Sequence, residues 1–329
     1  MNSRKRTRIL TLARHEYRAA VRSRVLIALL AILVAVTAAS VYVAAVDYRS
    51  QLADYQAYKS AAVAGGLTKI APSPLALLSL LRGAMEYIEI IGAIIAITLG
   101  YLSINRERAN RTLPLIRSRP VTAGELAAGN TLGALGVIST LILATTAAAV
   151  LCLGVIGNDW INGEQALKLL LAYVASIVYM GTFYCLGAIV TARSKVAING
   201  LLVALGIWLV IVLVLPQIGD TLDADNQVPG GLFSALTLDH SGEVKILTHF
   251  HAYEQVRTGI EASSLAKHYE RFAFGMIDVK DRYRGLSISQ LLHRKWIDIA
   301  WLAIYAAALG ALMRRTFRNQ PTIPTEGPS

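Results

Sequence analysis

Charged residues and the common motifs of soluble enzymes are scarce in this chain of 329 residues. Only 16% of the residues are charged and 55% are hydrophobic, which is too apolar for an ordinary soluble domain. No G-x-x-x-x-G-K-[ST] stretch is present, which excludes ATP hydrolysis through a P-loop. Neither H-E-x-x-H nor paired C-x-x-C occurs, and no residue pattern suggests an intramembrane protease or transferase. We therefore expect a membrane protein that is not an enzyme and binds no cofactor itself.

Cysteine is nearly absent as well, with Cys152 and Cys185 as the two instances. Both come late in long apolar stretches that would cross a membrane in opposite directions. A disulfide needs alpha carbons within about 7 Å, so we expect two separate packing residues.

Histidine is rare in the first 239 residues, and five of the six histidines lie at position 240 or later. His249, His251 and Glu254 in "HFHAYE" have a spacing that could hold a metal ion on one helix or strand face. Such spacing is common by chance, so we expect no metal site and exposed, polar histidines on a solvated surface.

Long apolar stretches are what the sequence does contain. A bilayer core of about 30 Å needs roughly 20 mostly apolar residues per helix. The first stretch has the general shape of a signal peptide, but its length and the lack of a small-x-small cleavage site favour an uncleaved helix. Asp298, near the start of the last and shortest stretch, is expected to reach the lipid headgroups. We predict an all-α protein with six transmembrane helices: Val25–Val46, Tyr87–Asn105, Thr131–Gly157, Leu169–Ala192, Val196–Gly219 and Ile297–Met313.

The distribution of basic residues predicts the orientation of these spans, because Lys and Arg in short loops stay on the cytoplasmic side. With both termini inside, the cytoplasmic segments hold eighteen of the 32 basic residues and four of the 21 acidic ones. The net charge of +11 is then a topological signal facing an anionic leaflet, and we expect no nucleic-acid partner. The chain is then predicted to begin with a cytoplasmic helix, 1–24, followed by spans one to five over 25–219. That region includes an outer segment, 47–86, and a cytoplasmic segment, 106–130. An outer helical cap, 220–296, the last span, 297–313, and a disordered cytoplasmic tail, 314–329, complete the chain.

The two outer segments contain further helical patterns. "DYRSQLADYQAYKS" could extend the first helix beyond the membrane until Gly65-Gly66, with Pro72 and Pro74 following. Residues 253–272 of the outer cap place four apolar residues roughly on one helical face: Val256, Ile260, Leu265 and Phe272.

The segment before the first span has the pattern of an amphipathic helix. Five apolar residues recur at helical spacing, with arginines on much of the remaining surface: Ile9, Leu12, Ala13, Ala20 and Val21. Such a helix lies in the membrane interface with its apolar side down. A basic flank that only enforces topology is the alternative.

The cytoplasmic segment 106–130 is basic and too long for a minimal turn between two helices. Arg106–Arg111 continue the second span, and Pro114 and Pro120 break it. Thr122 and Glu125 form a capping-box pattern, from which Leu126, Gly129 and Leu132 continue into the third span. We therefore expect two helical ends with an exposed corner that presses on a soluble partner.

This segment resembles the coupling segment of permeases in the type-2 exporter branch of ATP-binding-cassette (ABC) transporters. "RHEYRAAVRSR", with Arg14, Glu16, Tyr17 and Arg18, is similar to the interfacial elbow helix of that family, and the layout is similar to copper-maturation permeases of nitrous-oxide reductase systems. Arg111 and Asn130 depart from the pattern, which has Gly and Lys there. The matching positions are Glu107, Thr112, Leu113, Leu115, Pro120, Val121, Glu125, Leu126 and Gly129.

The resemblance implies a complex in which a separate ABC ATPase binds ATP and Mg and a second permease copy completes a homodimer. It also implies a bacterial or archaeal cytoplasmic membrane. The corner Arg117–Glu125 would rest in a groove of the ATPase, with Leu115 and Val121 as apolar anchors. Arg117 and Arg119 would pair with acidic residues of the ATPase, and lipid phosphate is the alternative partner of these arginines.

The substrate leaves few traces in the sequence. Glu89 and Asp298 are the ionisable residues inside the spans, and both lie close to an outer end, where boundary residues are expected more often than substrate contacts. So few charges disfavour a proton- or sodium-coupled carrier, and no pair of spans shows matched interruptions. A non-transporting membrane assembly or sensor protein with an outer partner-binding cap is the alternative function.

Overall fold

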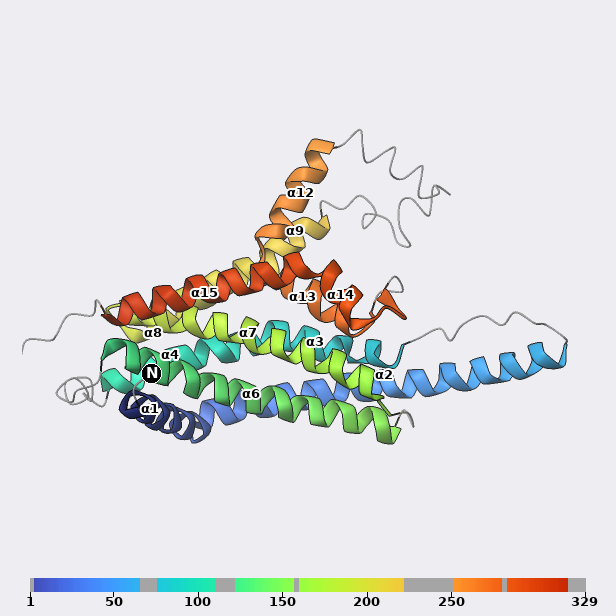
Figure 1. Ribbon diagram of the computed structural model, residues 1–329, viewed down its shortest axis with the longest axis horizontal. Coiled ribbons are helices and arrows are strands. Elements are labelled where there is room, and N and C mark those ends of the chain that lie inside the picture. Colours follow the sequence, from blue (N-terminus) through green and yellow to red (C-terminus); the bar gives the residue numbers. More distant parts are fainter. Residues whose placement is uncertain are drawn as a thin grey trace, which may run out of the picture.

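The computed structural model of the protein is helical throughout the residues that it describes, with no strand among them. These residues are 3–65, 76–109, 122–156, 160–221, 251–279 and 283–318. The long helices run side by side along the long axis of the molecule (Figure 1). The predicted all-helical fold is confirmed, because six helices in this part of the chain are long and apolar enough to cross a membrane: Arg24–Ala64, Leu77–Arg106, Gly124–Ile156, Gly163–Arg193, Ala197–Ile218 and Trp296–Arg318.

The order of elements begins with α1 (Ser3–Val21) and α2 (Arg24–Ala64), which is the first span. The second span joins a 3₁₀ turn, two α-helices and a π-helical turn: η1 (Leu77–Leu81), α3 (Arg82–Tyr87), η2 (Ile88–Gly92) and α4 (Ala93–Ala109). The third and fourth spans are α6 (Ala123–Ile156) and α7 (Gly163–Arg193). The fifth span joins α8 (Ala197–Leu209), the π-helical turn η3 (Val210–Val214) and α9 (Leu215–Thr221). Three shorter helices precede the last span: α12 (His251–Ser263), α13 (Leu265–Met276) and α14 (Ile288–Arg294). The last span is α15 (Trp296–Arg318).

Several spans are longer than the apolar stretches that predict them, because polar residues at their ends continue the helix. α7 begins with a capping box, in which the Asn162 side chain accepts from the backbone N–H of Gln165 (2.9 Å) and the Gln165 side chain accepts from that of Asn162 (2.8 Å). α15 continues to Arg318, so the tail predicted to be disordered from residue 314 begins inside a helix. Residues 319–329 lie outside the described part.

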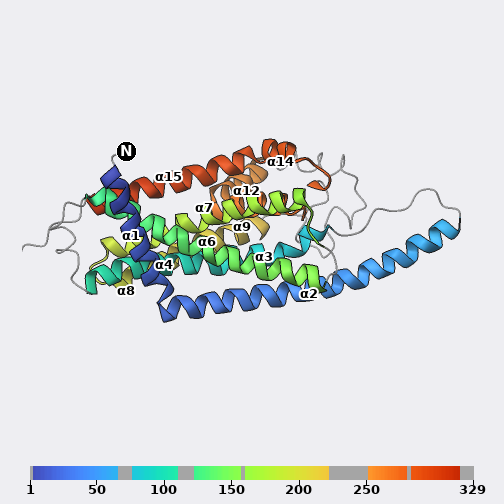
Figure 2. The ribbon, with the colours of Figure 1, turned by 60° about the horizontal axis from the view of Figure 1, so that its bottom comes forward.

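The first span, α2, extends far beyond the other spans at one end of the bundle (Figures 1 and 2). Its 41 residues give a length of roughly 60 Å, about twice the bilayer core. The helix ends at Ala64, and the backbone N–H of Gly65 donates to the carbonyl of Ala61 (2.9 Å). The predicted extension of the helix and its end at Gly65 are both confirmed, whereas Pro72 and Pro74 lie outside the described residues.

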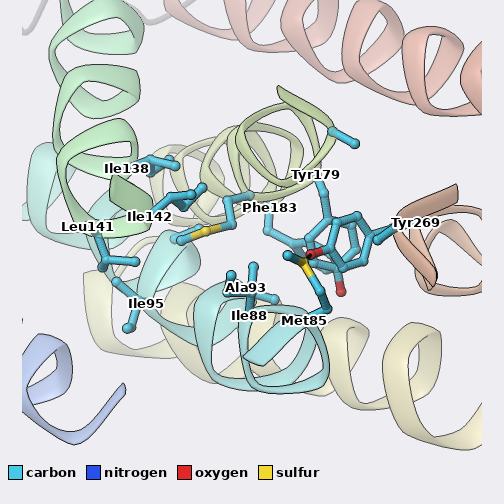
Figure 3. Close-up of a cluster of buried hydrophobic side chains, with 14 of the residues drawn as sticks. Met85, Ile88, Ala93, Ile95, Ile138, Leu141, Ile142, Tyr179, Phe183 and Tyr269 are labelled. Carbon is cyan, nitrogen blue, oxygen red and sulfur yellow. Dashed lines mark hydrogen bonds between the residues drawn. The ribbon is translucent and has the colours of Figure 1, made fainter. Parts of the chain in front are cut away.

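The core forms around α7, against which the second span packs most closely. A Cβ atom on Gly187 of α7 would lie 2.5 Å from the backbone oxygen of Ile97, and one on Gly100 of α4 would lie 2.4 Å from that of Tyr184. Glycine at these two positions therefore allows the two backbones to approach, as small residues do between membrane helices. Figure 3 shows the apolar cluster beside this contact, with residues from the second span, α6, α7 and α13. Cys152 and Cys185 are both free, as expected.

The segment 220–296, which is predicted to lie outside, consists of separate helices where it is described. Ser264 ends the helical stretch before it and caps α13: its Oγ accepts from the backbone N–H of Lys267 (3.4 Å) and donates to the carbonyl of Ile211 (2.9 Å). Val256 on α12 is 58% exposed, whereas Leu265 and Phe272 on α13 are buried. The prediction of one continuous apolar face is therefore wrong, because two helices of different direction share those residues (Figure 1).

A buried polar cluster joins α13 to α15. His268 Nδ1 lies 2.9 Å from Asp298 Oδ1, and His268 Nε2 lies 2.9 Å from the carbonyl oxygen of Ala262. Lys295 Nζ lies 3.5 Å from the other carboxylate oxygen of Asp298. Two predictions are wrong here, since His268 is buried rather than exposed and Asp298 points into the protein rather than to headgroups. Burial of these polar groups is tolerated because the His268 ring and the Lys295 ammonium group both contact the Asp298 carboxylate inside the fold.

Candidate coupling site

One end of the bundle brings together the ends of the second and third spans, α1, the turn after α7 and the end of α15 (Figures 1 and 2). Leu115, Arg117, Arg119, Pro120 and Val121 lie outside the described residues. Glu107 belongs to α4, but its side chain is not described. The structure therefore describes the two helices that flank the predicted corner rather than the corner itself.

The start of the third span has the predicted capping box. The backbone N–H of Thr122 donates to Glu125 Oε2 (3.0 Å), and the backbone N–H of Glu125 donates to Thr122 Oγ1 (3.2 Å). These two bonds satisfy backbone donors that the first turn of a helix leaves without a partner. Arg8 Nη1 lies 3.7 Å from Glu125 Oε2, so α1 also reaches this first turn.

The helix α1 packs on the third span through a row of glycines. A Cβ atom on Gly129 would lie 2.5 Å from Leu12 Cβ, and one on Gly133 would lie 2.6 Å from the backbone oxygen of Ala13. Ile9, Leu12 and Ala13 are half-buried and Ala20 is buried, so part of this face packs against protein, which the sequence pattern did not predict. Val21 is 46% exposed and lies off the face.

An ion pair joins α1 to the second span. Arg106 Nη2 donates to Glu16 Oε1 at 2.5 Å, and the Glu16 side chain is only 7% exposed. Burial raises the pKa of Glu16 above its ordinary value, and the nearby Arg106 guanidinium opposes this effect. The neighbouring Tyr17 hydroxyl lies 3.2 Å from Thr140 Oγ1 of α6. Of the predicted elbow residues, Glu16 and Tyr17 therefore hold the helix in place, whereas Arg14 and Arg18 are exposed.

A second arginine joins the second span to the end of the fourth. Arg108 donates from Nη2 to the carbonyl of Ala192 (2.8 Å) and from Nη1 to the carbonyl of Ser194 (2.9 Å). These carbonyls lie at the C-terminal end of α7, where the last helical turn lacks partners and a cation is favourable. Sequence reasoning missed this role because 84 residues separate Arg108 from Ala192.

The comparison with known families decides which kind of helical membrane protein this is. A family model described as ABC-2 family transporter protein matches residues 10–320, which is nearly the whole chain. The chain belongs to the ABC-2 transporter family. A search of the curated proteins finds no significant match. Membership makes the protein a multi-pass membrane permease component and implies an ABC ATPase as its partner.

The residues considered for metal binding and substrate contact belong to other parts of the chain. Among the described residues no group of three or more His, Cys, Asp or Glu could hold a metal ion. The predicted set is not tested by this, because His249 is outside the description and the side chains of His251 and Glu254 are not described. Glu89, in the π-helical turn η2, is buried, and within the described part of the chain its carboxylate makes no hydrogen bond or ion pair.

The backbone of Glu89 is held by aromatic residues from two other helices. The Tyr179 hydroxyl donates to the carbonyl oxygen of Glu89 (2.9 Å), and the Tyr179 ring stacks on Tyr269 of α13 with centroids 4.4 Å apart. The Tyr269 hydroxyl lies 2.8 Å from Ser176 Oγ, and burial raises the pKa of Tyr269. The side chain of Glu89 is therefore part of the packed interior rather than a residue at the water boundary.

Proposed function

We propose that the protein is the membrane-spanning permease subunit of an ABC exporter, driven by a separate ATPase subunit that binds ATP and Mg. Residues 106–130 carry the contact with the ATPase, and α1 is the interfacial elbow helix. Two copies of the chain form the membrane part of the complex. Both termini and segment 106–130 face the cytoplasm of a bacterial or archaeal cell.

The ion pairs and hydrogen bonds that flank segment 110–121 support this proposal. Arg106 binds α1, Arg108 binds the end of the fourth span, and Glu125 lies beside Arg8 of α1. The second, third and fourth spans and α1 are thereby joined on both sides of the segment. A push on the corner moves these helices together as a rigid body, which is how closure of an ATPase pair can reach the far side of a membrane.

Charge reversal tests the contact with the ATPase. Arg117→Glu combined with Arg119→Glu is expected to weaken binding of the ATPase by roughly a hundredfold or more, because close charge pairs across an interface are worth about 1.5 kcal/mol or more each. Arg294→Glu is the matched control, since Arg294 is exposed on α14 and outside the coupling site. If the double variant still binds the ATPase and still stimulates its activity, the proposed contact between the corner Arg117–Glu125 and the ATPase is wrong.

A second variant separates binding from transmission. Arg108→Gln removes the tie to the fourth span but leaves the corner intact. The ATPase is expected to bind normally, whereas the amount of substrate moved per ATP hydrolysed falls. Normal transport per ATP in this variant would show that the bonds of Arg108 to the end of α7 do not transmit the movement of the ATPase to the spans.

The outer surface supports a second candidate, a non-transporting assembly or sensor protein. α2 continues well beyond the other spans and offers a long helical surface to a partner (Figure 1). A neighbouring gene with a P-loop and an ABC signature motif favours the transporter. A stable complex with an outer partner, combined with no ATPase that binds, would favour the second candidate.

A further inference from the structure

A pocket lined by arginines lies between the end of the last span and the start of the third. Ala311, Arg314, Arg315 and Arg318 line it from one face of α15, and Thr122 and Gly124 line it from the first turn of α6. The pocket is open and has a volume of about 480 Å³. The Nε atom of Arg314 lies 3.7 Å from the place where a Cβ atom on Gly124 would stand, so the guanidinium faces the bare backbone of the helix start.

The three guanidiniums of this pocket have no counter-charge among the described residues. Arg314, Arg315 and Arg318 are exposed, and none makes an ion pair or hydrogen bond within the described part of the chain. Glu16 pairs with Arg106 of α4, and Glu125 belongs to the capping box of α6. Segment 110–121 adds three arginines and no acidic residue.

Few other acidic residues of the chain are expected at this end of the bundle. The predicted cytoplasmic segments contain only two more, Glu107 and Glu326, against three guanidiniums. The N-terminus of α6 adds a further partial positive charge to the pocket. The arrangement therefore suits an anion from outside the chain, and guanidinium groups match phosphate geometry best.

The depth of the pocket along the membrane indicates the source of that anion. From Trp296 at one end of α15 to Arg314, eighteen residues span roughly 27 Å, close to the thickness of a hydrocarbon core. The exposed Trp296 ring has the chemistry of an interfacial anchor at the opposite boundary. The arginines therefore lie at headgroup level. We propose that this pocket binds the phosphate group of an anionic phospholipid and holds the last span against the third.

Lipid-dependent stability of the full chain in a neutral detergent tests the proposal. Phosphatidylglycerol is expected to raise the melting temperature in a saturable way, because a ligand that binds only the folded state stabilises it. Phosphatidylcholine and inorganic phosphate at the same concentrations are the other two arms. Because no ATPase is present, this result does not depend on the proposed function.

Two variants assign the effect to the pocket. Substitution of Arg314, Arg315 and Arg318 by Gln is expected to weaken phosphatidylglycerol binding roughly a hundredfold, at roughly fivefold per arginine. Substitution of Arg6, Arg22 and Arg24 by Gln is the matched control, since it removes the same charge from exposed positions outside the pocket. Gly124→Leu keeps every charge but occupies part of the pocket, so it is also expected to weaken binding.

Several results would overturn the proposal. Equal stabilisation by phosphatidylcholine would remove the role of the charge, and equal stabilisation by inorganic phosphate would make the ligand a soluble anion. Equal losses in the two triple variants would mean that lipid responds to net charge only. Unchanged lipid binding combined with lost ATPase binding in the pocket variant would assign these arginines to the ATPase instead.

Discussion

The ion pair between Glu16 and Arg106 gives the most quantitative prediction, which concerns the variant Arg106→Gln. The substitution leaves a carboxylate buried without its cation, and breaking a buried ion pair in this way costs about 3–5 kcal/mol. Arg106 is 26% exposed, so we expect a cost just below that range, about 2–3 kcal/mol at neutral pH, after allowance for solvent screening. Arg24→Gln, at an exposed arginine, is expected to cost less than about 0.5 kcal/mol.

The pH dependence of this loss follows from the direction of the pKa shift. Burial raises the pKa of Glu16 in the folded protein, and removal of Arg106 raises it further. A carboxyl group with a raised pKa favours the folded state below its unfolded pKa, and that contribution is lost as the pH rises through the folded pKa. The cost of Arg106→Gln is therefore expected to be small below the ordinary value of 4.5 and to grow toward pH 7.

Chemical unfolding of the purified protein in detergent measures both effects. Wild type, Arg106→Gln and Arg24→Gln are compared at acidic and neutral pH, with the free energy of unfolding as the readout. The reasoning would be refuted if the two variants lost the same free energy at neutral pH. It would also be refuted if the cost of Arg106→Gln were the same at both values.

Three further substitutions have expected effects on stability. Gly187→Leu places a side chain against the backbone of α4 and is expected to prevent folding. Gly206→Leu is expected to be tolerated, because Gly206 has open space around it. The two variants are compared by the fraction of purified protein that is monodisperse in detergent. Lys168→Met leaves Asp278, 3.1 Å from Lys168 Nζ in wild type, buried without a cation, and is expected to lower the free energy of unfolding by about 3 kcal/mol. An equal loss in Lys168→Arg would contradict the role of charge. Tyr269→Phe is expected to cost about 1 kcal/mol in a denaturant titration, since the hydroxyl loses its hydrogen bond with Ser176 and a weaker one to the sulfur of Met85. An unchanged midpoint would contradict the role of these bonds.

Features that depend on local sequence could be predicted well. The capping box of Thr122 and Glu125 links residues three apart, and the helix end at Gly65 follows from a Gly-Gly pair. The number of spans follows from apolar stretches of membrane length. The exact helix ends did not follow, because hydropathy marks the part of a helix inside lipid and says little about polar turns that continue it.

Features that depend on tertiary contacts could not be predicted. Glu16 and Arg106 are 90 residues apart, and each alone has the pattern of a cytoplasmic flank. The apolar face of α1 has the pattern of a lipid-facing surface, and its close approach to Gly129 and Gly133 of α6 could not be predicted from that pattern. Asp298 lies near the start of the last span, and its partner His268 belongs to another helix. A single sequence contains no periodicity that joins such pairs.

Contact with a cytoplasmic ATPase requires segment 106–130 to lie on the cytoplasmic side of the membrane. Arg117→Cys, in a background where Cys152 and Cys185 are replaced by Ala, allows labelling with a membrane-impermeant thiol reagent. We predict labelling in inside-out vesicles, protection from labelling when the ATPase is bound, and no labelling in intact cells. Labelling of Cys at position 117 from the outside of intact cells would contradict the central claim.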